Sequence, residues 1–183
     1  MRLVILGGPG SGKGTQAKWL SDYFKIPMIS TGNILRNAIS EQTQLGKKAQ
    51  DYVEKGELLP NEIMIEFMRE HLEKNALDKG WILEGYPRTA FQAEELDFLL
   101  ETLEQKLNYA IYLEVSEPVM KQRSLRRSLM DDQPEIIEHR INIFKQYTIP
   151  LLDYYQGTKR LLTIAGEAST DEVGQEILSK IIH

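Results

Sequence analysis

The chain has 183 residues, of which 42% are hydrophobic and 27% are charged, and this balance favours one folded domain with a sizeable core over a disordered chain. The net charge of −5 gives no electrostatic reason to expect nucleic acid as a partner, and the absence of cysteine excludes a disulfide framework and a thiolate metal site. No stretch approaches the roughly 20 apolar residues of a membrane span, and none resembles a targeting segment, so we expect a cytoplasmic protein with no membrane partner.

Short apolar runs alternate with longer helical patterns along the chain. Strands are predicted at Leu3–Leu6, Trp81–Leu83, Tyr109–Leu113 and Leu161–Ile164, with the shorter run Pro27–Ser30 as a further candidate. Helices are predicted at Lys13–Phe24, Asn61–Leu72, Ala90–Leu103, Glu117–Arg127 and Pro134–Tyr155, and from Thr170 onward. Pro150 predicts a kink in the longest of them. The alternation predicts an α/β fold with a five-stranded parallel sheet and helices on both faces.

A glycine-rich run, Gly7–Thr15, lies between the first strand and the first helix. Its glycines allow backbone amides to converge on an anion, and the helix N-terminus behind them adds positive potential. Lys13 then reaches the β- and γ-phosphates of a nucleotide, and the Thr15 hydroxyl lies within reach of Mg²⁺ or a phosphate oxygen. The strict phosphate-loop pattern has serine or threonine directly after the lysine, whereas Gly14 intervenes here. The run predicts a nucleotide site at the carboxyl ends of the strands and leaves the reaction open.

Further segments follow the phosphate loop in an order and spacing typical of one enzyme family. They are Ile29–Arg36, Gly85–Thr89 with Gln92, the pair Asp131-Asp132 followed by Arg140, and Pro150–Tyr155. With the loop form Gly-x-Pro-Gly-x-Gly-Lys-Gly-Thr, they resemble the adenylate kinase family over nearly the whole chain. The resemblance implies a monomer with a P-loop nucleoside monophosphate kinase fold, as a single domain over residues 1–183. It also implies an AMP-binding helical segment at about 30–59 and a lid at about 127–133, too short for a zinc-binding or long hairpin lid.

The resemblance implies which residues bind each nucleotide. The ATP-binding set is Gly10, Ser11, Gly12, Lys13, Gly14, Thr15, Arg123, Arg127, Gly166 and Ala168. The AMP-binding set is Thr31, Arg36, Glu57, Leu58, Leu59, Gly85, Tyr86, Pro87, Arg88, Gln92 and Arg140. The catalytic set, which neutralises charge on the moving phosphoryl group, is Lys13, Arg88, Arg123, Arg127 and Arg140.

Individual roles follow from the same resemblance. Arg36 and Arg88 would hold the AMP phosphate, and Arg140 would lie between the two nucleotides. Arginine suits these positions because its planar fork binds phosphate oxygens bidentately and stays protonated. Thr31 and Gln92 match positions that contact the adenine of AMP, and pyrimidine monophosphate kinases usually carry alanine in place of Thr31.

The expected reaction is the reversible transfer of the γ-phosphoryl group of ATP to AMP, giving two ADP, with Mg²⁺ as the cofactor. No direct protein ligand is expected for the metal, which Thr15 and Glu84 would hold through water. Two alternatives stay open. One is a kinase of another nucleoside monophosphate, against which Thr31 and Gln92 argue. The other is a nucleotide-binding regulator with weakened catalysis, against which the retained arginines and Lys13 argue.

Three positions depart from the family pattern. Glu84 stands where the family usually has aspartate, which predicts an altered metal geometry, and Asn33 replaces an aspartate that caps helices equally well. Leu129 stands where short-lid relatives carry arginine, and losing one phosphate-facing arginine typically lowers the rate by about 10²-fold or more. The pair Asp131-Asp132 has two interpretations that do not exclude each other: it caps the helix that follows, and it orients an arginine.

Overall fold

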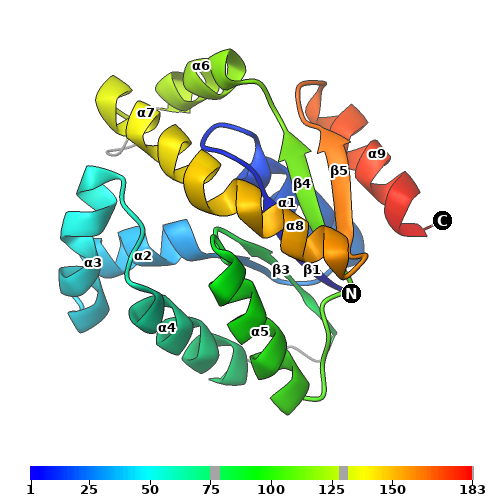
Figure 1. Ribbon diagram of the computed structural model, residues 1–183, viewed down its shortest axis with the longest axis horizontal. Helices are drawn as coiled ribbons and strands as arrows, with labels where there is room; N and C mark the ends of the chain where they lie inside the picture. The colour runs from blue at the N-terminus through cyan, green and yellow to red at the C-terminus, as the bar shows by residue number, and fades with distance from the viewer. Residues whose placement is uncertain (75–78, 128–131, 183) are drawn as a thin grey trace.

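The structure is a computed structural model that describes residues 1–74, 79–127 and 132–182. Its centre is a sheet of five parallel strands in the order β2-β3-β1-β4-β5, with helices on both faces (Figure 1). The strands are β1 (Arg2–Leu6), β2 (Met28–Ser30), β3 (Trp81–Glu84), β4 (Tyr109–Glu114) and β5 (Leu161–Ala165). The helices are α1 (Lys13–Phe24), α2 (Thr31–Ser40), α3 (Gln44–Lys55), α4 (Asn61–Lys74), α5 (Ala90–Thr102), α6 (Glu117–Arg127), α7 (Pro134–Ile143), α8 (Ile149–Gly157) and α9 (Thr170–Ile182), with a π-helical turn, Phe144–Thr148, between α7 and α8. The predicted α/β fold is confirmed, and the short candidate run forms the edge strand β2.

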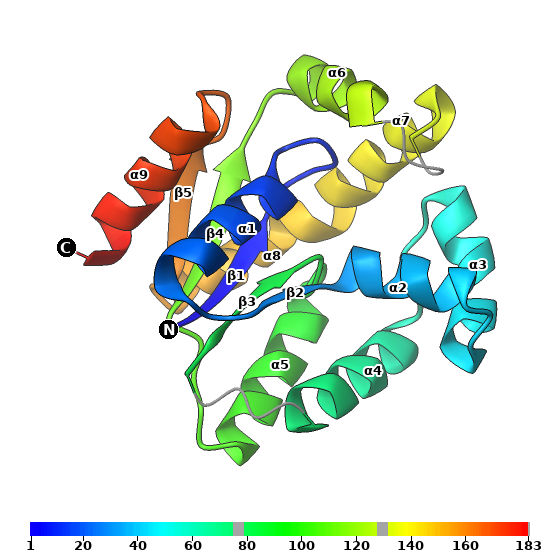
Figure 2. The ribbon, with the colours of Figure 1, turned by 180° about the vertical axis from the view of Figure 1, so that it is seen from behind.

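The central strand β1 supplies both halves of the hydrophobic core, because alternate side chains point to opposite faces of a sheet. Val4 and Leu6 join the cluster on the face that α4, α5 and α8 cover. Leu3 and Ile5 join the cluster on the other face, with α1 and α9, which lie nearer the viewer in Figure 2. All of these side chains are 3% exposed or less. Burial on both faces explains why the strand appears in the sequence as an unbroken apolar run.

The strand order places a crevice beside β1. Strands β2 and β3 lie on one side of β1, and β4 and β5 lie on the other. When the chain continues to one side of a parallel sheet after one strand and to the other side after its neighbour, the two loops separate at the carboxyl ends of these strands. Ligands of such folds bind in the crevice between the loops. The glycine-rich loop that follows β1 therefore lies at the crevice.

The opposite, amino edge of the sheet is closed by main-chain contacts. The N–H of Arg2 donates to Oδ1 of Asn108 at 2.7 Å, and the N–H of Trp81 donates to the carbonyl of Met1 at 3.0 Å. Gly80 has a φ of 108°, and a Cβ atom there would lie 1.9 Å from the Met1 carbonyl oxygen. Only glycine combines this backbone conformation with so close an approach. The N-terminus is thereby fixed to β3 and β4 at their starts.

The long helix predicted at Pro134–Tyr155 is present as α7, the π turn and α8. In the π turn the N–H of Ile149 donates to the carbonyl of Phe144, five residues back instead of four. Pro150 explains this wide turn, because it has no N–H to donate and its ring clashes with the carbonyl four residues earlier. The expected interruption near Pro150 therefore takes the form of a π turn in the residues before it.

Helices α2 and α3 form a pair that extends away from the sheet (Figure 1). Each begins at a hydroxyl that caps its first turn. Ser30 accepts from the N–H of Asn33 at 3.5 Å, and Thr43 accepts from the N–H of Gly46 at 3.0 Å. The pair falls within the segment that the sequence predicts for AMP binding.

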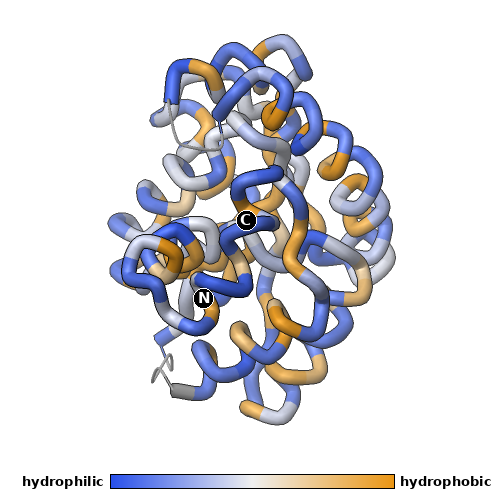
Figure 3. The backbone as a smooth tube through the Cα atoms, turned by 90° about the vertical axis from the view of Figure 1, so that its left-hand side faces the viewer, coloured by the Kyte–Doolittle hydropathy of each residue, from blue (hydrophilic) through white to orange (hydrophobic). Residues whose placement is uncertain are grey.

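The outer helices have one face on the core and one in solvent. Figure 3 shows hydrophobic and hydrophilic residues alternating along them. In α3, for example, Ala49 is buried whereas Lys47 and Lys48 are exposed. Among the described residues, no helix is both long enough and apolar enough to cross a membrane.

Candidate active site

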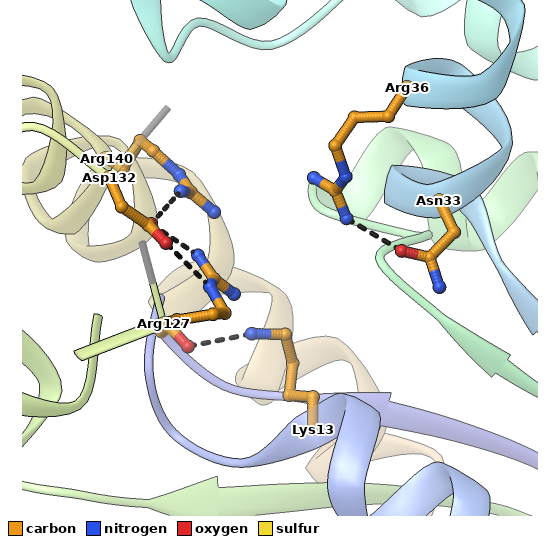
Figure 4. Close-up of polar contacts among 7 residues, drawn as sticks. Lys13, Asn33, Arg36, Arg127, Asp132 and Arg140 are labelled. Atoms are coloured by element: carbon orange, nitrogen blue, oxygen red, sulfur yellow. Dashed lines mark hydrogen bonds and ion pairs between the residues drawn. The ribbon is translucent and has the colours of Figure 1, made fainter. Parts of the chain in front are cut away.

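The glycine-rich loop packs tightly between β1 and α6. Gly10 has a φ of 73°, and a Cβ atom there would lie 2.3 Å from the carbonyl oxygen of Met120 and 2.7 Å from the Ser124 hydroxyl. A side chain at this position would therefore push the loop away from α6. Lys13, the first residue of α1, follows the loop, and its Nζ donates to the carbonyl of Gly8 at 2.7 Å (Figure 4).

Burial is the largest influence on Lys13 and lowers the pKa of its amino group to about 7. The negative charge of Glu84 opposes this shift, whereas the positive charges of Arg88, Arg140 and Arg127 add to it. The lysine is therefore partly buried, among groups of its own sign. A polyphosphate in the crevice would supply the negative charge that stabilises its protonated form.

One cavity lies between α2, the chain after α3 and the loop after β3. Its lining contains most of the predicted AMP-binding residues, namely Thr31, Arg36, Glu57, Leu58, Leu59, Gly85, Arg88, Gln92 and Arg140. Two residues of that set lie elsewhere. Pro87 lines the adjoining cavity, and the Tyr86 side chain is buried in the core, where its hydroxyl donates to the Gln92 carbonyl at 3.2 Å. Tyr86 thus supports the loop without presenting its ring to this cavity.

Arg88 and Gln92 are held together at the start of α5. The N–H of Arg88 donates to Oε1 of Gln92 at 2.8 Å, and Nε of Arg88 donates to the Gly85 carbonyl at 2.9 Å. On the other side, Nε2 of Gln92 donates to Oδ1 of Asn61 at 2.9 Å. Thr89 caps the helix by accepting from the N–H of Gln92 at 3.1 Å. The protein itself therefore sets the orientation of both side chains.

A larger cavity, of about 560 Å³, opens beside the glycine-rich loop. It contains the predicted phosphate-binding residues Gly10, Gly12, Lys13, Gly14, Thr15, Arg123 and Arg127. Two of the departures from the family pattern also line it. Oε2 of Glu84 accepts from the Ser30 hydroxyl at 2.8 Å, and Oδ1 of Asn33 accepts from Nη2 of Arg36 at 2.9 Å (Figure 4). The longer glutamate side chain thus reaches across from β3 to the end of β2.

A further cavity lies at the loop between β5 and α9. It contains the remaining predicted ATP-binding residues, Ser11, Gly166 and Ala168, and shares Gly12, Thr15 and Arg123 with the phosphate cavity. The Arg123 guanidinium donates to the Gly166 carbonyl at 2.8 Å and to the Glu167 carbonyl at 3.1 Å. The structure therefore places the whole predicted ATP-binding set along two adjoining cavities.

Asp132 orients two arginines (Figure 4). Its side chain is fully buried, and its carboxylate accepts from Nη2 of Arg127 at 2.6 Å and from Nε of the same residue at 2.9 Å. Nη1 of Arg140 lies 3.5 Å from the same carboxylate. Helix α7 begins after Gln133, whose side chain makes no capping hydrogen bond. Arginine orientation is thus the interpretation that holds for Asp132, while Asp131 lies outside the described residues.

A fourth cavity, lined by positive charges, joins the cavity of the predicted AMP-binding residues to the phosphate cavity. Lys13, Arg88 and Arg140 all line this fourth cavity. Figure 4 shows Arg127 and Arg140 on the side of the crevice opposite Arg36. Cationic side chains from separate elements converge here, which is what transfer of a phosphoryl group between two polyanions requires.

The donor set of the phosphate cavity fits the expected Mg²⁺. The described residues contain no group of three His, Cys, Asp or Glu side chains that would hold a metal by themselves. The Glu84 carboxylate and the Thr15 hydroxyl line the same cavity as Lys13. In nucleotide sites Mg²⁺ usually takes one or two protein oxygens together with waters and the substrate phosphates. These residues therefore suit a metal that arrives with the nucleotide.

Some residues of the site were not found from the sequence. Ser30 holds Glu84, and Asn61 holds Gln92, but a hydroxyl or amide that acts through a neighbour has no motif of its own. For Ser30 a signal was present, because it lies within the Ile29–Arg36 segment. Leu129, the departure in the lid, lies outside the described residues.

Comparison with known proteins identifies the family. A family model for adenylate kinase matches residues 5–160. The chain is 58% identical over 182 residues to adenylate kinase 2 of Nostoc sp., an alignment that covers 100% of this chain and 99% of that protein. It is 56% identical over 181 residues to adenylate kinase 2 of Synechocystis sp., covering 99% of this chain and 100% of that protein, and 45% identical to adenylate kinase 1 of Nostoc sp., covering 96% of each. These matches confirm the resemblance of the motifs, and the chain belongs to the adenylate kinase family of nucleoside monophosphate kinases.

Proposed function

We propose that this enzyme catalyses the reversible reaction of ATP and AMP to two ADP, with Mg²⁺ as the cofactor. The observation that carries the proposal is the cavity that Lys13, Arg88 and Arg140 share. It adjoins the pocket with the predicted AMP-binding residues on one side and the phosphate-loop cavity on the other. Nucleotides bound in these two places would direct their phosphates toward the same cationic group.

The chemistry requires no protein base, because the acceptor phosphate is already anionic. An oxygen of the AMP phosphate attacks the γ-phosphorus of ATP and forms the new P–O bond. The bond from that phosphorus to the β,γ-bridging oxygen breaks, and its electron pair leaves on ADP. Lys13, Arg88 and Arg140 neutralise the charge that spreads over the moving group, and their fixed positions hold the two phosphates in line.

Selection of AMP rests on buried polar groups in its pocket. The Thr31 and Gln92 side chains are both buried and both line this cavity. Bonds to Arg88 and Asn61 hold Gln92. A bond to the Glu84 carbonyl holds Thr31, so the polar atoms of both side chains stay in fixed positions. A base whose polar groups do not meet those positions would bind less tightly. Arg36 and Arg88 would bind the phosphate of the same nucleotide.

On the donor side, Arg123 and Arg127 would approach the ATP phosphates, and the chain near Gly166 and Ala168 would contact the adenine. Support comes from the two adjoining cavities in which all four residues lie. When bound, Mg²⁺ would neutralise part of the phosphate charge. Thr15 would hold it through water, together with the carboxylate of Glu84.

The proposal also covers closure of the site over its substrates, the oligomeric state of the enzyme and its place in the cell. We expect the helical segment at about 30–59 and the short lid at about 127–133 to close over the substrates and exclude water, which would otherwise accept the phosphoryl group. We also propose that the enzyme is a monomer, as the family resemblance suggests, and that it is cytoplasmic, since no stretch of the sequence resembles a targeting segment. Light scattering after gel filtration tests the oligomeric state.

The proposal is tested by incubating the enzyme with Mg·ATP and each of AMP, CMP, UMP and GMP, and separating the diphosphates by chromatography. An Arg88→Ala sample, prepared in parallel, controls for contaminating kinase. ADP formed with AMP alone, and lost in the control, is the expected result.

Two other results would overturn parts of the proposal. Product with a different acceptor would leave the fold and the transfer chemistry unchallenged. It would show that Thr31 and Gln92 do not select the adenine base. Clear ATP binding without product from any acceptor would favour a nucleotide-binding regulator.

A further inference from the structure

The π turn determines which side chains of the α7–α8 helix face the site. Arg140 precedes the turn and Thr148 is its last residue. A regular α-helix rotates by about 100° per residue, so these two positions would differ by about 80°. A wide turn accommodates one additional residue, which reduces the rotation by about 100° and leaves the two side chains within about 20° of each other.

The surroundings of the two side chains agree with this geometry. Arg140 and Thr148 line the same cavity, together with Lys13 and Arg88. Tyr147 is the residue that a regular helix would place in line with Arg140, and it is 43% exposed. The π turn therefore directs Tyr147 to solvent and Thr148 into the site.

Thr148 makes a direct contact with the loop that carries the AMP-phosphate arginine. The residue is 6% exposed, and its hydroxyl donates to the carbonyl of Arg88 at 3.1 Å. Gln92 accepts from the N–H of Arg88, and Gly85 accepts from its guanidinium. Those contacts lie within the β3–α5 region, whereas the Thr148 contact ties Arg88 to the helix that carries Arg140.

We propose that Thr148 is a positioning residue for the acceptor site: its hydroxyl, aimed by the π turn, fixes Arg88 relative to Arg140. The proposal rests on the proposed role of Arg88 in binding the AMP phosphate. Without the hydroxyl, the main chain at Arg88 loses this hydrogen bond to α7–α8, and the separation of the two arginines is less firmly fixed. The acceptor phosphate is affected, whereas the ATP cavities, which Thr148 does not line, are not.

The test compares Thr148→Val, which removes the donor and keeps the shape, with Thr148→Ser, which keeps the donor. Thr148→Ala repeats the test with a smaller side chain if the valine variant is unstable. Thr102→Val is the matched control, because Thr102 lies at the far end of α5 and its hydroxyl also donates to a main-chain carbonyl, that of Leu99, at 2.7 Å. Calorimetry gives the AMP Kd, and kinetics with each nucleotide varied in turn give the two KM values.

Loss of one neutral hydrogen bond predicts an AMP Kd and an AMP KM that rise by about 3- to 10-fold in Thr148→Val. The KM for ATP should stay at its wild-type value, Thr148→Ser should restore AMP binding, and Thr102→Val should change neither constant. An equal rise in both KM values together with a lower Tm would mean that Thr148 only supports the fold, which would overturn the proposal.

Arg88→Ala separates this proposal from the one on which it rests. If Arg88→Ala binds AMP with wild-type affinity, the acceptor site itself has been misassigned. If Arg88→Ala abolishes AMP binding while Thr148→Val matches the wild type in both AMP constants, the acceptor site stands and the positioning role of Thr148 is wrong.

Discussion

The guanidinium of Arg127 and the carboxylate of Asp132 form a bidentate ion pair, with Nη2 2.6 Å from Oδ1 and Nε 2.9 Å from Oδ2. The Arg127 side chain is 39% exposed, whereas that of Asp132 is 0% exposed. Two parallel bonds of this kind fix the plane of an arginine fork as well as its position. A buried acid that no ligand needs to touch thereby determines how an arginine faces the crevice.

Asp132→Asn should lower kcat/KM for phosphoryl transfer by about 10- to 100-fold, because an amide keeps the shape but cannot hold Arg127 and Arg140 in place by charge. Steady-state kinetics with both nucleotides varied measures the effect. Asp22→Asn is the control, since Asp22 pairs with Lys18 on the surface at a site where loss of the partner costs little. Wild-type kcat/KM in Asp132→Asn would show that the arginines need no anchor.

ATP binding should take up nearly one proton at pH 8. Burial lowers the pKa of Lys13 to about 7, so its amino group is mostly neutral at that pH. A bound polyphosphate favours the charged form and raises this pKa. Calorimetry in buffers of different ionisation enthalpy measures the uptake, which should disappear at pH 6. Lys13→Arg should also show none, because arginine stays charged; equal uptake in that variant would assign the proton to another group.

The same shift makes the stability of the nucleotide-free enzyme depend on pH. The pKa of Lys13 falls from 10.5 to about 7 on folding, so between these values the unfolded chain binds more protons than the folded one. The free energy of unfolding therefore gains a term that rises with pH across this window and is constant below it. Urea unfolding at pH 7 and pH 9 should show this gain in the wild type but not in Lys13→Met. An identical gain in both would remove Lys13 as the cause.

Glu84→Gln should raise the Mg²⁺ concentration for half-maximal activity by about 10-fold or more. Glutamine keeps the length and still accepts from the Ser30 hydroxyl, but it loses the charge that attracts the metal and its waters. Calorimetry of ATP binding at several Mg²⁺ concentrations provides a second measurement. Glu114→Gln, at the exposed end of β4, is the matched control. If both variants share the wild-type Mg²⁺ dependence, Glu84 does not face the metal.

Gly10→Ala should abolish ATP binding and lower the Tm. The new Cβ would lie 2.3 Å from the Met120 carbonyl oxygen at a φ of 73°, so the phosphate loop must move. Gly157→Ala is the control, because a Cβ there meets nothing within 4 Å, and the helix α8 should gain up to about 1 kcal/mol. Retained ATP affinity in Gly10→Ala would mean that the loop tolerates displacement.

Much of the fold and of the phosphate site was predictable because the signals are local. The unbroken apolar run Leu3–Leu6 is enough to predict a buried strand. The glycines beside Lys13 predict an anion-binding turn, because such a turn requires backbone conformations that glycine adopts most easily. The shorter candidate run at Pro27–Ser30 also forms a strand, β2 over Met28–Ser30. Boundaries were less certain, and β3 extends one residue beyond the prediction, to Glu84.

Contacts between distant residues could not be predicted from the sequence. Ser30 and Glu84 are 54 residues apart, and Arg88 and Thr148 are 60 apart. Strand register brings the first pair together, and the π turn brings the second. Pro150 marks an interruption of the helix in the local sequence, but it does not indicate which side chain the turn would direct toward Arg88. Asp132 shows the same limit, because an acid before a helix is equally typical of a cap until the arginines are placed beside it.

The contacts that hold the N-terminus and the residues of the candidate active site lie at opposite edges of the sheet. At the amino edge, Asn108 accepts a hydrogen bond from the main chain of Arg2, and Gly80 packs closely against the carbonyl of Met1. The arginines and the phosphate loop lie at the carboxyl edge. Enzymes commonly lose activity when they are stabilised, because rigidity and function compete for the same residues. Here the contacts of the N-terminus and the cationic side chains lie at opposite edges, so substitutions around the N-terminus should change the thermal stability more than the turnover.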